Sequence, residues 1–183
     1  GRSPSEGAVA RELGKVIEGR QGRVVVGCFS SNIARIQTLS SIAAKNKRYF
    51  AILGRSASGM ARCARQVGLL ESQFQPIHPE HLGYLPPSEV LAVATGSQGE
   101  WGAALYRLMM QTHPDLSLDA GDTVILSSKT IPGNEQSLKQ LVQGLRARGI
   151  EVIEAEDSQT PLHASGHPCQ EELSDLYQIL KPA

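Results

Sequence analysis

Short apolar runs alternate with amphipathic segments along the 183 residues of the chain. An uninterrupted apolar run bounded by turn residues is typical of a buried strand, whereas apolar residues at every third or fourth position indicate one face of a helix. The pattern predicts strands over residues 24–27, 49–53, 90–94, 123–126 and 150–153. It predicts a first helix that begins near residue 4, and further helices over about 33–43, 56–67, 103–109, 138–149 and 173–180. This alternation predicts an α/β fold: a single three-layer domain with a mostly parallel sheet covered by helices on both faces, as in Rossmann- and flavodoxin-like proteins.

Capping residues predict where the first and last helices begin. Ser3 can cap the first helix, with Pro4 in its first position and Glu6 completing a capping box. Near the other end, Pro168 suits the first position of the last helix and therefore places His167 at the N-cap. At that position the imidazole is expected to face the crevice at the end of the sheet.

Composition narrows the class of protein. Lys plus Arg and Asp plus Glu both total 18, so a broadly basic surface that coats nucleic acid is not expected and any phosphate binding must be local. Three cysteines without C-x-x-C spacing, Cys28, Cys63 and Cys169, argue against a disulfide framework or a zinc knuckle and favour a reducing, cytoplasmic setting. Neither a membrane span nor a signal peptide is expected from the apolar runs. The start at Gly1 suggests an excised piece, or a cleaved tag.

Four polar motifs follow the apolar runs, at residues 29–32, 95–100, 127–135 and 163–167. In a parallel sheet the carboxyl ends of the strands share one edge, where helix N-termini point unpaired N–H groups at an entering anion. Hydroxyls, glycines and two histidines collected at that edge predict a phosphate-binding crevice.

Each motif also has a purely structural interpretation. Asn32 can be a helix cap and Arg35 a solvated surface charge instead of a phosphate clamp. Residues 97–100 match a helix capping box. His163 can be a buried, hydrogen-bonded histidine, and His167 can do no more than cap the last helix. Only the clustering of the motifs favours the phosphate crevice.

Several enzyme signatures are absent from the sequence. There is no G-x-G-x-x-G, no G-x-x-x-x-G-K-[ST], no G-x-S-x-G and no H-x-H-x-D-H segment. His78 and His81 have a metal-like spacing, but such a pair in a proline-rich loop is usually structural or exposed. The residues by themselves therefore predict no metal site and no complete reaction.

Taken together and in order, the motifs resemble those of ribonuclease J over nearly the whole chain. The segments that carry the resemblance are residues 1–6, 29–35, 85–87, 94–100, 131–135, 163–167 and 171–173. The resemblance implies that residues 1–183 form a β-CASP domain, which in that family is inserted within a metallo-β-lactamase domain. It further implies a zinc-dependent enzyme with endonuclease and 5′-to-3′ exonuclease activities in RNA processing and decay.

The resemblance also assigns roles and partners. His167 matches the β-CASP histidine that projects toward the composite active site, and it is the expected catalytic residue. The expected RNA- or phosphate-binding residues are Ser30, Ser31, Asn32, Arg35, Ser97, Gln98, Ser127, Ser128, His163, Ser165, Gly166 and His167. The implied partners are RNA and the missing metallo-β-lactamase domain, with no membrane, and self-association of the parent enzyme stays open.

The zinc ligands of the family belong to the metallo-β-lactamase part. No cofactor is therefore expected in this chain, zinc is expected in the intact enzyme, and the isolated chain is expected to be inactive. The alternative is a stand-alone binding module for a nucleotide or a phosphorylated metabolite, without hydrolysis.

Overall fold

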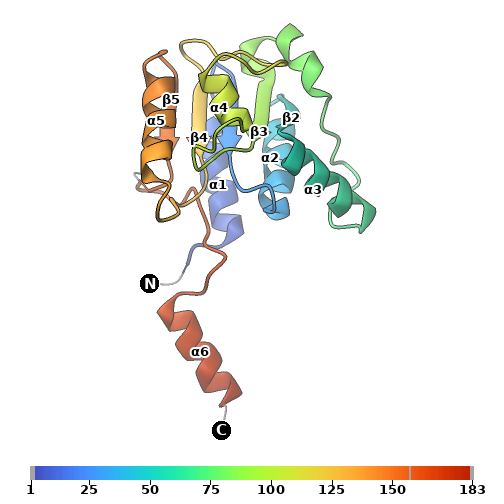
Figure 1. Cartoon of the computed structure of the whole chain (residues 1–183). Helices are drawn as coiled ribbons and strands as arrows, with labels where there is room; N and C mark the ends of the chain where they lie inside the picture. Colours follow the sequence, from blue (N-terminus) through green and yellow to red (C-terminus); the bar gives the residue numbers. More distant parts are fainter. Residues whose placement is uncertain (1–2, 157, 182–183) are drawn as a thin grey trace.

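The apolar runs expected to be strands lie side by side in one sheet (Figure 1). The computed structural model of the chain describes residues 3–156 and 158–181, so Gly1 and Arg2 of the first motif lie outside the described residues. Within these ranges the strands are β1 (Val24–Gly27), β2 (Tyr49–Leu53), β3 (Val90–Ala94), β4 (Thr123–Leu126) and β5 (Glu151–Glu154), in the order β2-β3-β1-β4-β5. Every pairing in that order is parallel, which confirms the predicted α/β fold.

Helices cover both faces of the sheet because successive strand residues point to opposite sides. The core of one face joins the sheet to α1 (Glu6–Ile17), α2 (Ile33–Lys45) and α3 (Arg55–Gln66), and that of the other to α4 (Ala104–Met109) and α5 (Glu135–Arg146). In β1, Val24 and Val26 pack into the first core and Val25 into the second. The three-layer arrangement is therefore confirmed.

The register of the central strands brings their carboxyl ends level. Gly27 at the end of β1 pairs with Ala94 at the end of β3 on one side and with Leu126 at the end of β4 on the other. The polar segments that follow these strands consequently start from the same edge of the sheet.

The first helix begins later than the sequence suggested. Its N-cap is Ser5, whose hydroxyl accepts a hydrogen bond from the N–H of Ala8 at 3.1 Å, so the assignment of Ser3 as the cap is wrong. Glu6 occupies the first helical position and does not close a capping box, because its carboxylate is held by Arg35.

The last helix, α6 (Gln170–Leu180), also begins later than expected. Cys169 is its N-cap, and it forms a reciprocal capping box with Glu172 in which the Glu172 carboxylate accepts from the Cys169 N–H at 2.8 Å. The prediction that His167 caps this helix is wrong, since the capping box fixes the helix start two residues further on.

The α6 helix lies apart from the rest of the domain, at the end of an extended segment (Figure 1). None of its residues is buried, and Leu173, Leu176, Tyr177 and Leu180 each expose half or more of their surface. Its apolar side thus has no partner within the described chain. Between α3 and β3, the chain forms the short 3-10 helices η1 (Pro79–Tyr84) and η2 (Pro87–Glu89).

In the described ranges, the helices are too short or too polar for any of them to span a lipid bilayer.

Candidate functional site

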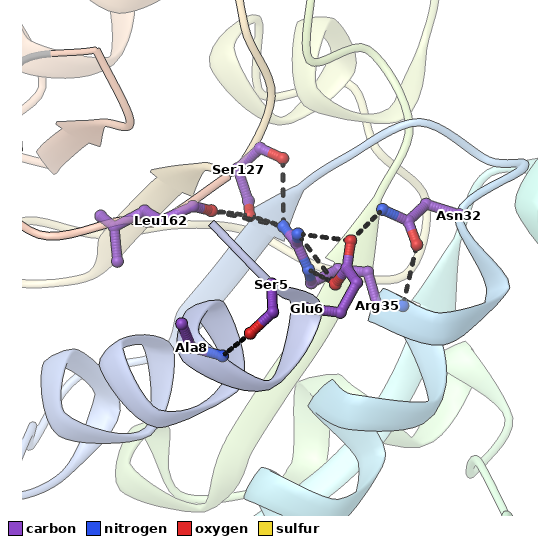
Figure 2. A network of polar contacts seen from close by, with 7 residues as sticks. All are labelled: Ser5, Glu6, Ala8, Asn32, Arg35, Ser127 and Leu162. Atoms are coloured by element: carbon purple, nitrogen blue, oxygen red, sulfur yellow. Dashed lines mark hydrogen bonds and ion pairs between the residues drawn. The ribbon is translucent and has the colours of Figure 1, made fainter. Parts of the chain in front are cut away.

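Arg35 lies at the centre of a hydrogen-bond network at the carboxyl edge of the sheet (Figure 2). Its guanidinium donates to both carboxylate oxygens of Glu6 at 3.1 Å and to the carbonyl oxygens of Ser127 and Leu162 at 3.3 Å. It also donates to the hydroxyl of Ser127, which in turn donates to the Leu162 carbonyl. We call Glu6, Asn32, Arg35, Ser127 and Leu162 the arginine network. It joins α1, α2, the end of β4 and the segment after β5.

Asn32 completes the arginine network by positioning the start of α2. Its side-chain oxygen accepts from the Arg35 N–H at 3.0 Å, and its Nδ2 donates to Glu6 at 3.4 Å. The structural interpretation of Asn32 as a helix cap is confirmed.

Arg35 itself has no exposed surface, so its interpretation as a solvated surface charge is wrong. A buried guanidinium is costly unless its N–H groups are paired, and here the acceptors of the arginine network pair them. In this structure the guanidinium of Arg35 holds the edge together by bonding to groups of the domain itself.

Gln98 forms a second network beside the first. Its side-chain amide donates to the hydroxyl of Ser128 at 3.2 Å and to the carbonyl of Lys129 at 3.0 Å, and its oxygen accepts from the N–H of Ile131 at 2.8 Å. We call these four residues the glutamine network. It ties the turn after β3 to the loop after β4, and both Gln98 and Ser128 are buried.

The turn that contains Gln98 is not the start of a helix. Residues 97–98 and 101–102 form turns and α4 begins only at Ala104, so the interpretation of residues 97–100 as a helix capping box is wrong. The Glu100 carboxylate instead accepts from the N–H of Gln98, two residues back, at 2.9 Å. Gly99 has a φ of +77°, and a Cβ there would lie 2.4 Å from the carbonyl oxygen of Ser137, so only glycine fits this contact with α5.

The serines of the edge differ in exposure. Ser97 is buried beneath the turn after β3, whereas Ser30 is half-buried and Ser31 exposed on the loop between β1 and α2. Neither Ser30 nor Ser31 uses its hydroxyl in a hydrogen bond within the described chain. These two hydroxyls are therefore available to a ligand, and that of Ser97 is not.

His163 follows Leu162 of the arginine network and is half-buried. Within the described residues its Nδ1 is buried without a hydrogen-bond partner. Burial lowers the pKa of His163, and the positive charge of Arg35 lowers this pKa further, against opposing effects of the Ser127 backbone and Glu6. The imidazole is thus neutral at pH 7, and it lines a cavity of about 450 Å³ together with the exposed Lys129 and with Glu156.

Ser165, Gly166 and His167 lie on the segment that leads out to α6 (Figure 1). All three are exposed. A local turn fixes their backbone conformation, and in it the His167 N–H donates to the Ser165 hydroxyl at 3.0 Å. The structure therefore brings together Asn32, Arg35, Ser127 and His163, and separately Gln98 and Ser128. It leaves the 165–167 turn outside both networks.

Sequence reasoning missed two members of the arginine network. Glu6 was assigned to a capping box, and Leu162 takes part only through its backbone carbonyl. A backbone acceptor carries no signature in the sequence, and the pairing of Glu6 with Arg35 depends on how α1 and α2 pack together.

Across residues 3–156 and 158–181, no three His, Cys, Asp or Glu side chains gather in a group that could hold a metal ion.

Comparisons with known proteins identify what this chain is similar to. The family model described as "Ribonuclease J, beta-CASP domain" matches residues 21–145. The chain is 40% identical over 182 residues to Ribonuclease J of Sinorhizobium meliloti, 38% identical over 183 residues to Ribonuclease J2 of Bacillus subtilis, and 40% identical over 182 residues to Ribonuclease J of Thermus thermophilus. These matches cover 100% of the chain but only 31% or 32% of each relative, so the chain spans about a third of their length.

Proposed function

The chain belongs to the β-CASP domain family of ribonuclease J, and we propose that it supplies the RNA-holding side of the cleft in an RNA-cleaving enzyme. In this proposal the enzyme processes and degrades RNA by endonuclease and 5′-to-3′ exonuclease cleavage. The other side of the cleft is a zinc-dependent metallo-β-lactamase domain outside these 183 residues.

One observation carries the proposal. The whole chain aligns with relatives named ribonuclease J, but it covers only about a third of the length of each relative. A domain of a larger enzyme would align in this way. The polar segments after β1, β3 and β4 support it, because they meet at the one edge of a parallel sheet where ligands usually bind.

We divide the predicted site residues into two groups by their exposure. Ser30 and Ser31 with their unbonded hydroxyls, His163 with its unpaired Nδ1, and the exposed turn 165–167 are the groups that would meet an RNA phosphate. Asn32, Arg35, Ser127, Gln98 and Ser128 act as positioning residues, since their polar groups are already paired within the domain. Ser97 is buried and supports the turn after β3.

Zinc does not fit the residues at hand. The described part of the chain offers no group of His, Cys, Asp or Glu ligands for it. What this chain can contribute is imidazoles, hydroxyls and backbone N–H groups around a phosphate. His167 would stabilise charge or move a proton at the scissile phosphate.

The test uses the full-length enzyme with His167→Asn, and His78→Asn as the matched control because His78 is also exposed but lies in the loop before η1. We expect single-turnover cleavage of a defined RNA to fall on the order of 10²-fold for His167→Asn, with zinc content and thermal unfolding unchanged. Parental cleavage rates in that variant, or loss of zinc together with activity, would contradict the catalytic role.

The isolated chain separates the proposal from its alternative. We expect weak, salt-sensitive binding of single-stranded RNA, with a slope of roughly 0.7 per phosphate contact, and no RNA turnover. Turnover that a chelator abolishes and that persists through repurification would contradict the division of labour proposed here. Tight binding of a phosphorylated metabolite, in a chain whose parent gene encodes no metallo-β-lactamase segment, would favour the stand-alone binding module.

A further inference from the structure

A cavity of about 1070 Å³ opens at the carboxyl ends of β2 and β3, away from the arginine network. Arg55 and Arg62 of α3 line one side of it, and Arg107 of α4 lines another. Because α3 and α4 cover opposite faces of the sheet, the cavity lies across the sheet edge. This is the edge at which ligands bind in parallel α/β sheets.

The arginines of this cavity are not used by the fold in the way that Arg35 is. Arg55 and Arg62 are exposed and make no hydrogen bond or ion pair within the described chain. Within the described chain, the guanidinium of Arg107 makes one hydrogen bond, in which its Nε–H donates to the Gly102 carbonyl at 3.1 Å. Guanidinium groups that line a concave site with unpaired N–H groups are suited to phosphate, which they can bind through two parallel hydrogen bonds.

The other titratable groups of the cavity do not fully cancel the positive charge of its three arginines. Glu100 and Asp115 line the cavity and offset two of the three arginine charges, and the Glu100 carboxylate also accepts from the Gln98 N–H at 2.9 Å. His113 also lines it, and burial lowers the pKa of this histidine, so it adds no positive charge at pH 7. Three arginines thus face two carboxylates.

The start of α3 breaks the usual rules of helix capping. Its N-cap is Gly54, which offers no side-chain cap, and its first turn contains no acidic residue. Arg55 stands in the first position, where the helix dipole disfavours a cation. Gly54 is required there, since its φ is +113° and a Cβ would lie 2.3 Å from Thr95 Oγ1. An anion in the cavity would compensate both the uncapped N–H groups and the Arg55 charge.

An exposed aromatic side chain lies beside the cavity. Trp101 is the single tryptophan of the chain and is 85% exposed. Its sequence neighbours Glu100 and Gly102 both line the cavity, and its ring centroid lies 6.3 Å from that of Tyr106. An exposed indole next to a cationic cavity is the combination with which proteins hold a nucleobase and its phosphate.

We propose that this cavity binds a nucleoside phosphate, with Arg55, Arg62 and Arg107 around the phosphate group and Trp101 stacked on the base. The ligand chemistry is shared by a nucleotide within an RNA strand and by a free mononucleotide. The site does not depend on the function proposed above, because a mononucleotide satisfies the same chemistry without any cleavage.

The test is a fluorescence titration of the whole chain, since Trp101 reports the site directly. AMP, a short oligoadenylate and inorganic phosphate are the probes. We expect saturable quenching of Trp101 by AMP or by the oligoadenylate, and competition without quenching by inorganic phosphate. Quenching by the oligoadenylate alone identifies an RNA strand as the ligand, and equal quenching by AMP identifies a mononucleotide.

Arg55→Ala and Arg62→Ala should each weaken binding on the order of tenfold, the loss expected for one charge-assisted hydrogen-bonded contact. Lys45→Ala is the matched control, because it removes one exposed positive charge near the end of α2, at the opposite edge of the sheet. All three side chains are exposed, so thermal unfolding should stay at the parental temperature. The proposal is overturned if neither nucleotide probe quenches Trp101 saturably, or if the arginine variants bind as tightly as Lys45→Ala.

Discussion

Arg35 and Glu6 are 29 positions apart in the sequence, yet the guanidinium of one donates to both carboxylate oxygens of the other at 3.1 Å. Arg35 is fully buried, whereas the Glu6 side chain keeps 38% of its surface exposed. The pair therefore differs from a surface ion pair, because loss of Glu6 leaves a buried charge without its anion.

Glu6→Ala should lower the free energy of unfolding by about 1–2 kcal/mol, less than for a fully buried pair because solvent reaches Glu6. Urea unfolding monitored by circular dichroism measures this change. Glu12→Ala is the control, since Glu12 pairs with an exposed Lys15 on the same helix and should change stability by less than about 0.5 kcal/mol. Equal effects of the two substitutions would contradict the structural importance of the Arg35–Glu6 pair.

Gln98→Ala should destabilise the chain by about 2 kcal/mol, because it leaves the N–H of Ile131 and the hydroxyl of Ser128 without their partner. Gln140→Ala, at an exposed position of α5, should change the unfolding free energy by less than about 0.5 kcal/mol. The same urea experiment compares them, and a Gln98 variant as stable as the Gln140 variant would show that the glutamine network contributes nothing.

His163 should make stability depend on pH. Burial and the nearby Arg35 charge lower its pKa in the folded chain, so the unfolded chain, with an ordinary pKa of about 6.5, takes up the proton first. The stabilising contribution is complete above that pH and is lost as the pH falls toward the folded pKa. Burial lowers the pKa of His113 in the same direction.

Unfolding midpoints measured from about pH 7.5 to 5.5 should therefore fall for the parent chain and fall less steeply for His163→Gln. His113→Gln separates the second histidine, and the double variant should flatten the profile further. An unchanged slope in His163→Gln would mean that this imidazole does not titrate as its burial implies. The low pKa of Glu151, which its hydrogen bond to Arg20 causes, affects stability only at more acidic pH.

Replacing a leucine by alanine should lower the free energy of unfolding much more in α2 than in α6. Leu39→Ala removes a fully buried side chain from the core and should cost about 2–5 kcal/mol. Leu176→Ala removes a half-exposed side chain from a helix that has no buried residue and should change stability by less than about 0.5 kcal/mol. A large loss for Leu176→Ala would show that α6 packs against the domain in solution.

Much of the fold could be predicted because it follows from local patterns. The apolar runs that became β1 to β4 have the boundaries that the pattern predicts, since strands largely buried on both faces are apolar at most positions. Helix starts were harder to predict. Ser3 and Ser5 are both plausible caps by residue type, and only the hydrogen bond to Ala8 distinguishes them. Cys169 is an uncommon cap that becomes one through its reciprocal bonds with Glu172.

In the candidate site, too, some features follow from the local sequence and others depend on the tertiary structure. The sequence alone determined that polar residues follow the strands, that the chain is an α/β domain, and that its motifs are those of the ribonuclease J β-CASP family, because periodicity and motifs are local properties of the chain. Only the tertiary structure decided that Arg35 is buried against Glu6, Ser127 and Leu162, that Gln98 joins two loops, and that Arg55 and Arg62 line one cavity. Those outcomes depend on which side chains packing brings within hydrogen-bond distance, and a residue's own identity does not record its distant partner.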